Sequence, residues 1–228
     1  MSCYHPLIAA PSGEKTKLGK DKYKILGAAE DFEEIRRNEV GILIPCGKCI
    51  GCRLDYSRRW ADRMMLELET AGCGVFLTLT YDNDNILWLD DNESGEKVGT
   101  LVKRDCQLFM KRLRKYYGDL SIRFFLAGEY GDKTKRPHYH CILFGVSLIN
   151  IGDCIYFGKN ELGQNYYTSE NLTRIWSKGH VLVANVSWQT CAYVARYILS
   201  IIGVNGVCNL TTHEVFILNV SPGKTSST

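Results

Sequence analysis

Residues 121–144, SIRFFLAGEYGDKTKRPHYHCILF, hold two apolar runs separated by a polar segment, and this arrangement decides the fold. The runs at 121–127 and 139–144 are rich in aromatic and β-branched residues, which favour strands. The segment between them contains glycine, lysine and proline, which favour a loop. We therefore expect an antiparallel hairpin of two strands.

Further strands and helices are predicted on both sides of this hairpin. Period-two and helical patterns indicate the order strand, helix, strand, strand, helix, strand, helix at residues 75–81, 101–117, 121–127, 139–144, 169–177, 180–186 and 187–199. Residues 82–99, which are acidic and contain glycine, are expected to be an exit loop. The order predicts an α+β fold with a ferredoxin-like antiparallel sheet backed by helices.

The remaining chain is expected to flank this core. We assign residues 1–72 to an N-terminal extension, 73–202 to the core and 203–228 to a divergent or truncated tail. Within the extension, residues 11–38 are polar with little periodicity and favour a loop, whereas 54–70 have the pattern of an amphipathic helix with a basic side.

Composition limits the class of protein. The chain has 228 residues with 45% apolar content, which is enough to bury a core and argues against disorder. A net charge of +3 is too small to indicate a nucleic-acid partner by itself. No apolar run approaches the length of a bilayer-spanning helix, so we expect no membrane partner and a cytosolic location.

Two histidines form a candidate metal site. His138 and His140 alternate along a strand, so both imidazoles project from one face of the sheet. The hairpin would bring the carboxylate of Glu129 beside them, and two imidazoles with one carboxylate leave ligand positions open. The alternative is a pair of exposed or hydrogen-bonded histidines. Tyr139, between them, is expected to lie in the core on the opposite face.

Two tyrosines form a candidate nucleophile pair. Tyr193 and Tyr197 are four residues apart in a helical segment, which places their hydroxyls on one face about 6 Å apart. A phenol with a pKa of about 10 is a weak nucleophile, so it would need a metal ion and a cationic neighbour, for which Arg196 is a candidate. The alternative is that both rings line a core with their hydroxyls at its edge.

Three cysteines in C-x2-C-x2-C spacing form a second candidate metal site. Cys46, Cys49 and Cys52 occupy a glycine-containing turn, and Cys3 or His5 would complete a tetrahedral zinc site with a structural role. Iron–sulfur ligation and three ordinary thiols are the alternatives.

Basic residues on the helix predicted at 101–117 are candidates for contacts with a DNA backbone: Lys111, Arg112, Arg114 and Lys115. Charged helix faces are also commonly just solvated.

Several segments together resemble a known family. The segments RPHYHCILFG (136–145), FLTLTYD (76–82), AYVARY (192–197), MSCYHP (1–6) and PCGKCIGCR (45–53) resemble replication initiators of the gokushovirus branch of the microviruses, in the histidine-hydrophobic-histidine (HUH) endonuclease superfamily. The resemblance covers most of the chain.

The resemblance implies a function. It implies a nickase dependent on Mg²⁺ or Mn²⁺ that cuts an origin in single-stranded DNA, forms a covalent 5′-phosphotyrosine intermediate and later rejoins the strand during rolling-circle replication. His138 and His140 match the metal ligands of the family, and Tyr193 and Tyr197 match its nucleophiles. Glu129 resembles the carboxylate ligand of related initiators. The host replicative helicase is implied as a partner, and the host cell cytoplasm as the location.

One departure from the family leaves a rival function open. Ser200 stands where relatives in the superfamily place a lysine. The rival is a catalytically impaired protein of the same fold that binds single-stranded nucleic acid. Other nucleases of the superfamily, such as relaxases and transposases, fit less well because the single-tyrosine types lack the paired tyrosines.

Overall fold

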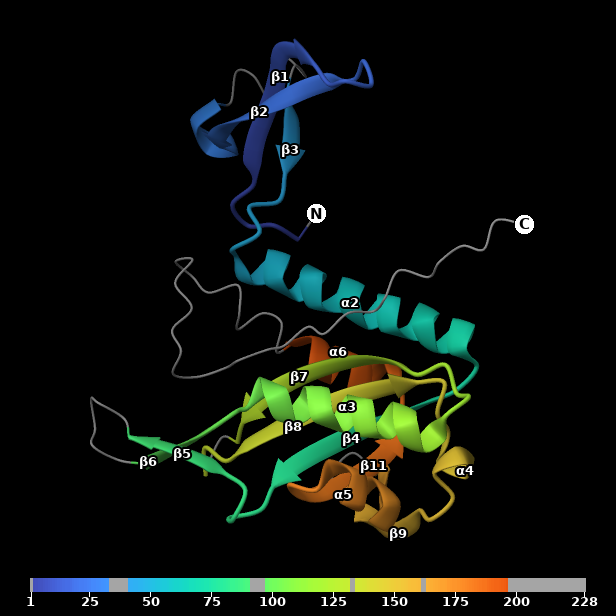
Figure 1. The fold of residues 1–228 in the computed structure, drawn as a ribbon. Coiled ribbons are helices and arrows are strands. Elements are labelled where there is room, and N and C mark those ends of the chain that lie inside the picture. The colour runs from blue at the N-terminus through green and yellow to red at the C-terminus, as the bar shows by residue number, and fades with distance from the viewer. Residues whose placement is uncertain (1, 33–40, 91–96, 132–133, 161–162, 197–228) are drawn as a thin grey trace. The chain divides into compact units, whose positions relative to one another are not determined.

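The computed structural model describes residues 2–32, 41–90, 97–131, 134–160 and 163–196 (Figure 1). The chain divides into two compact units, Met1–Ser57 and Arg58–Thr228, and the division falls inside helix α2 (Ile50–Ala71). None of the helices in these described segments has the length and apolar character needed to cross a bilayer.

The first unit contains a small antiparallel sheet. Its strands are β1 (Leu7–Lys15), β2 (Asp21–Ala28) and β3 (Ile42–Ile44), in the order β2-β1-β3, and a 3₁₀ helix, η1 (Ala29–Phe32), follows β2. The prediction of a loop over residues 11–38 was therefore wrong. Most of the β1–β2 ribbon is exposed, so its sequence needs no apolar face and lacks the period-two pattern from which strands are predicted.

The second unit is built on a six-stranded sheet with the order β7-β8-β4-β11-β10-β9, in which every neighbouring pair is antiparallel. The strands are β4 (Gly74–Tyr81), β7 (Arg123–Tyr130), β8 (Pro137–Phe144), β9 (Ile155–Lys159), β10 (Asn165–Thr168) and β11 (Gly179–Asn185). The helices are α3 (Lys103–Tyr117), α4 (Leu148–Ile151), α5 (Glu170–Trp176) and α6 (Trp188–Arg196). The predicted antiparallel sheet backed by helices is confirmed.

Two hairpins were not predicted. Strands β5 (Leu87–Asp90) and β6 (Lys97–Thr100) pair within the expected exit loop, and β9 with β10 extends the main sheet. All of β5 and most of β9 are exposed, so their sequences carry no alternation between buried and exposed residues.

The main apolar core lies between the sheet and helices α3 and α5. Tyr81, Tyr139 and Trp176 are fully buried there, and the ring of Trp176 meets those of both tyrosines edge-on, at 5.2 Å and 6.0 Å between centroids. Such arrangements stabilise a core beyond the area that they bury. Tyr139 thus lies in the core, as expected.

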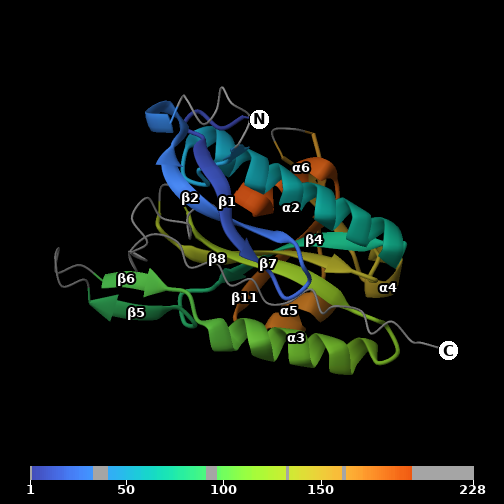
Figure 2. The same cartoon turned by 90° about the horizontal axis from the view of Figure 1, so that it is seen from above.

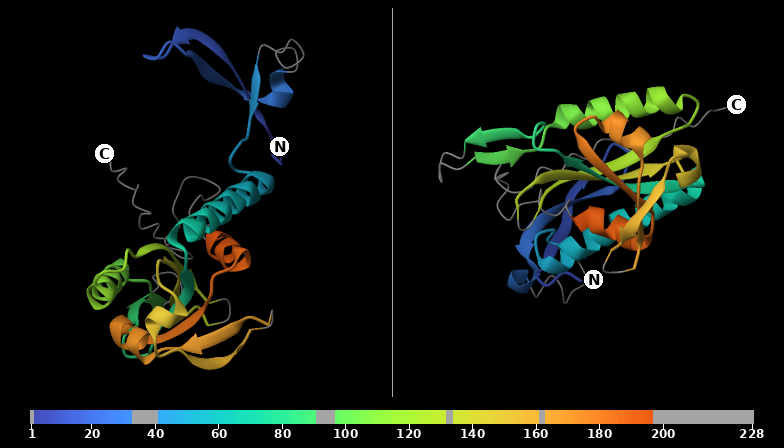
Figure 3. Two further views of the ribbon diagram at one scale, coloured as in Figure 1. Left: turned by 90° about the vertical axis from the view of Figure 1, so that its right-hand side faces the viewer. Right: turned by 90° about the horizontal axis from the view of Figure 1, so that it is seen from below.

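The opposite face of the sheet is covered by α6. Figure 2 and Figure 3 show α3 and α5 on one side of the sheet and α6 on the other. Because side chains alternate along β8, the residues on either side of Tyr139 point toward α6. The polar residues of the hairpin therefore gather on the α6 side.

The core contacts of α3 predict a large loss of stability on truncation. Leu113 is fully buried in α3, so Leu113→Ala should lower the free energy of unfolding by about 2–5 kcal/mol, because it removes packing and leaves a cavity. The matched control is Leu66→Ala in α2, where the side chain is 63% exposed and the change should be within about 0.5 kcal/mol. Urea unfolding followed by circular dichroism measures both, and equal effects would contradict this packing.

Candidate functional site

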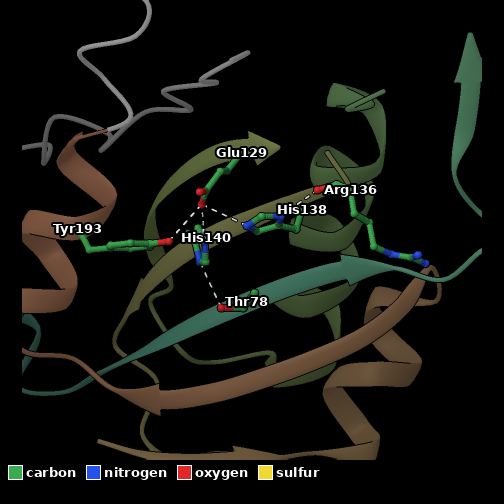
Figure 4. Close-up of polar contacts among 6 residues, drawn as sticks. All are labelled: Thr78, Glu129, Arg136, His138, His140 and Tyr193. Atoms are coloured by element: carbon green, nitrogen blue, oxygen red, sulfur yellow. Dashed lines mark hydrogen bonds and ion pairs between the residues drawn. The ribbon is translucent and has the colours of Figure 1, made fainter. Parts of the chain in front are cut away.

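The register of β7 against β8 brings a carboxylate and two imidazoles together. Glu129 stands directly opposite His138, and Ala127 stands opposite His140. One oxygen of Glu129, Oε2, lies 3.1 Å from Nε2 of His138 and 2.9 Å from Nε2 of His140 (Figure 4). The three residues therefore present their polar atoms to one point, as the predicted hairpin requires.

The outer nitrogens of both rings are also held. Nδ1 of His138 lies 3.1 Å from the carbonyl oxygen of Arg136, and Nδ1 of His140 lies 3.1 Å from Oγ1 of Thr78. Thr78 pairs with His140 across β4 and β8. We did not predict Thr78 from the sequence, although the alternation in FLTLTYD places its threonines on the face opposite the leucines.

The contact of His138 with the backbone fixes its tautomer. A carbonyl oxygen only accepts hydrogen bonds, so Nδ1 of His138 carries a proton and donates it to Arg136. In the neutral ring, the lone pair of Nε2 then faces Glu129 Oε2, which is another acceptor. A proton or a cation between the two atoms removes this conflict. Histidines that bind metals commonly donate their second N–H to a carbonyl in this way.

Burial keeps His140 in the form that can bind a cation. Glu129 is 7% exposed and His140 is 6% exposed. Loss of solvation lowers the pKa of His140, the Glu129 carboxylate partly opposes this, and repulsion from His138 adds to the lowering. A neutral imidazole keeps a lone pair available for a metal ion.

The donor set suits a divalent ion. The ligand atoms of Glu129, His138 and His140 all lie within 4.8 Å of one another. Two nitrogens and one carboxylate oxygen leave coordination positions open, which suits an ion that must also bind a substrate. The residues present therefore fit a catalytic rather than a closed structural metal site.

Tyr193 joins this cluster from α6. Its hydroxyl donates a hydrogen bond to Glu129 Oε2 at 3.3 Å, and its ring meets that of His140 edge-on at 5.1 Å between centroids. The guanidinium of Arg196 lies 5.9 Å from the centre of the Tyr193 ring. Tyr197 and Ser200 lie outside the described residues, so the pairing of the two tyrosines stays a prediction.

The start of α6 is fixed by reciprocal hydrogen bonds. The backbone N–H of Ser187 donates to Oγ1 of Thr190 at 2.9 Å, and the N–H of Thr190 donates to Oγ of Ser187 at 3.2 Å. This exchange satisfies N–H groups at the helix start that have no partner within the helix. Val194 and Ala195 are buried, so Tyr193, one residue earlier, is held in a defined orientation.

A cavity of about 370 Å³ adjoins His140 and Tyr193. It is lined on the sheet side by Phe76, Thr78 and Tyr166, on the α6 side by Trp188, Gln189 and Arg196, and by the amides of Asn160 and Gln164. The sequence did not predict it, because the β9–β10 hairpin that forms one wall was itself not predicted.

The basic residues of α3 lie on the other side of the sheet from this cluster. Arg112 donates to the carbonyl of Trp176 at 2.8 Å, and Arg114 donates to that of Ile122 at 3.1 Å. These two guanidiniums thus make internal contacts, whereas Lys111 and Lys115 are exposed. DNA contact through α3 stays a prediction.

Four cysteines form a second cluster in the first unit. The Sγ atoms of Cys3, Cys46, Cys49 and Cys52 lie within 4.8 Å of one another, so the fourth member is Cys3 and not His5. Hydrogen bonds from the backbone N–H groups of Cys52 and Tyr4 lower the pKa of Cys49 to about 6, whereas burial raises the pKa of Cys52 to about 12.

A family model described as replication-associated protein ORF2 matches residues 74–200, more than half of the chain. Among curated proteins, the chain is 31% identical to replication-associated protein ORF2 of Spiroplasma virus 4 over 210 residues, which are 90% of this chain and 62% of the relative. It is 35% identical to replication-associated protein VP4 of Bdellovibrio phage phiMH2K over 72% of this chain and 50% of that protein.

A third relative is replication-associated protein ORF4 of Chlamydia phage 1, with 34% identity over 68% of this chain and 37% of the relative. The chain thus spans between 37% and 62% of the length of these three relatives. No solved structure matches it significantly.

The geometry predicts that Glu129 contributes to binding of a divalent ion. Glu129→Gln should weaken Mn²⁺ binding by about tenfold or more, because it removes the negative ligand while keeping the shape of the side chain. The loss of the free-ion signal in electron paramagnetic resonance measures the affinity. Glu69→Gln, on the exposed surface of α2, is the control and should bind like the unaltered chain.

The contact of Thr78 with His140 predicts an effect of the same sign. Thr78→Val keeps the shape but removes the hydroxyl that orients the imidazole, so Mn²⁺ affinity should fall by about tenfold. Thr78→Ser retains a hydroxyl and should retain most of the affinity. Equal affinities of the valine and serine variants would show that the hydroxyl does not matter.

Proposed function

The chain belongs to the replication-associated protein ORF2 family of phages, and we propose that it starts rolling-circle replication by nicking and rejoining single-stranded DNA at an origin. The observation that carries the proposal is the convergence of Glu129, His138, His140 and Tyr193. A carboxylate oxygen, two imidazole nitrogens and a phenol hydroxyl meet within hydrogen-bonding distance. This set contains a nucleophile beside a place for a cation.

The proposed reaction is a transesterification by Tyr193. Its phenol oxygen forms a bond to the scissile phosphorus, and the bond from phosphorus to the 3′ oxygen breaks. This leaves a free 3′ hydroxyl and a 5′ phosphate joined to the tyrosine. One phosphoester replaces another, so the reverse reaction can rejoin the strand without an energy source.

The protein residues orient the reacting groups. Glu129 Oε2 accepts the hydrogen bond of the Tyr193 hydroxyl, so it fixes the direction of the nucleophile and can receive its proton. Glu129, His138 and His140 would hold Mg²⁺ or Mn²⁺, which would polarise the phosphate and offset the charge that develops on its oxygens. Arg196, exposed beside Tyr193, is placed to contact a phosphate.

The wider assignments follow from family membership and the sequence. The antiparallel sheet with its histidine pair supports a histidine-hydrophobic-histidine endonuclease fold. Tyr197 would be the second nucleophile, which permits two successive strand transfers. The sequence contains no G-x-x-x-x-G-K segment of a nucleotide-driven motor, so unwinding would fall to the host replicative helicase in the host cytoplasm.

A second candidate is a protein of the same fold that binds single-stranded nucleic acid without cutting it. It is favoured by Ser200, which stands where relatives in the superfamily have a lysine. Aromatic and amide groups in the cavity beside Tyr193 would serve either function, because they can stack on a base and hydrogen bond to its edge. The two candidates differ only in whether a covalent product forms.

Covalent attachment to DNA tests the proposal. Incubation with labelled circular single-stranded phage-type origin DNA and Mn²⁺ should give a protein–DNA adduct on denaturing gels, and EDTA should abolish it. Tyr193→Phe should reduce the adduct by about tenfold or more, because it removes one nucleophile and its hydrogen bond to Glu129. Tyr193→Phe with Tyr197→Phe should remove it completely.

The matched control is Tyr116→Phe, a half-exposed tyrosine of α3 on the other side of the sheet, which should leave the adduct unchanged. A folded chain that binds the origin but forms no adduct with Mn²⁺ would favour the binding function instead.

A further inference from the structure

The four cysteines of the first unit come from three separate parts of its chain. Cys3 precedes β1, Cys46 and Cys49 follow β3, and Cys52 lies in the first turn of α2. The Sγ atoms of Cys46 and Cys52 are 3.9 Å apart, and those of Cys49 and Cys3 are 3.8 Å apart. Every described cysteine is a free thiol rather than part of a disulfide.

These separations are those of four ligands around one ion. A zinc–sulfur bond is about 2.3 Å long, and a tetrahedral arrangement of such bonds places the sulfurs about 3.8 Å apart. An iron–sulfur cluster would insert an inorganic core between the cysteines and push their sulfurs further apart than the 4.8 Å limit observed here. The geometry therefore fits a single metal ion.

Backbone N–H groups point at the sulfurs. Tyr4 donates to Cys49 Sγ at 3.4 Å, Cys46 donates to Cys3 Sγ at 3.2 Å, and Cys49 donates to Cys46 Sγ at 3.4 Å. Hydrogen bonds of this kind stabilise negative charge on thiolates and fix their direction, as is needed for ligands to a cation. Gly47 has a φ of +74°, a conformation that other residues rarely adopt, and it turns the chain between Cys46 and Cys49.

A glycine also lets the N-terminal segment reach the helix. A Cβ atom added to Gly51 would lie 1.7 Å from the backbone oxygen of Ser2, which is an impossible overlap. Only glycine at this position permits the residues before β1 to lie against the first turn of α2. The sequence C-I-G-C therefore serves to bring Cys3 to the other three sulfurs.

The first unit has little else to hold it together. Its buried apolar residues, among those that the structure describes, are Ile8, Ala9, Ala29 and Cys52. A unit of this size with so small a core normally needs a disulfide or a metal ion to remain folded. The cluster links both ends of the β1–β3 sheet to the start of the helix, which is where such a link restricts the unfolded chain most.

We propose that Cys3, Cys46, Cys49 and Cys52 bind one structural Zn²⁺ that holds the first unit in its folded form. The site is closed, because all four tetrahedral positions are taken by protein sulfur, so it leaves no position for a substrate. It is distinct from the Glu129 cluster and does not depend on the nicking function.

Metal analysis of the purified full chain tests the site directly. Mass spectrometry of elements should find about one zinc per chain, and the Glu129→Gln plus His138→Ala variant should keep it, which separates this site from the one near Tyr193. Cys49→Ser should lose most of the zinc. Cys73→Ser, at a partly buried cysteine outside the cluster, is the matched control and should keep it.

A second measurement uses the unaltered chain and so does not depend on the folding of a variant. Cobalt exchanged into this chain should give thiolate-to-cobalt charge-transfer absorption with strong visible bands, which four tetrahedral thiolates produce. A zinc-selective chelator should then make residues 1–57 sensitive to protease. Iron in place of zinc, disulfides with no bound metal, or zinc retained by Cys49→Ser would each overturn the proposal.

Discussion

The pairing of β7 with β8 is the constraint on which the candidate site depends. In this register Glu129 faces His138, and side-chain alternation then places His140 on the same face. A slip of one residue in β8 would turn both imidazoles into the core and Tyr139 out of it. The burial of Tyr139 against Tyr81 and Trp176 opposes such a slip, so the apolar face of the sheet keeps the polar face in register.

The two faces of the sheet therefore have different roles. On one face, α3 and α5 cover a continuous apolar core. On the other, α6 brings Tyr193 to a carboxylate that also contacts two histidines. The buried Glu129 carboxylate would be costly without these partners, because a buried charge needs hydrogen bonds or counter-charges. The polar site is thus tolerated in the fold because its groups satisfy one another.

The sequence predicted the parts whose residues alternate between a buried and an exposed or polar side. The strands at β4, β7, β8 and β11 carry that pattern, and it placed His138, His140 and Glu129 together correctly. The exposed strands β1, β2, β9 and β10 do not carry it, so neither the small sheet nor the cavity wall was predicted. The choice between Cys3 and His5 also needed the structure, since a contact between residues 46 positions apart leaves no local pattern.

That long separation has a consequence for the order of events during synthesis. Cys3 leaves the ribosome well before Cys46, Cys49 and Cys52, and until they follow it cannot reach its partners. At a pace of translation of about 5–20 residues per second, the interval is on the order of seconds. During that time Cys3 is a lone thiol on an unfolded segment, so the first unit can mature only where the surrounding solution keeps thiols reduced.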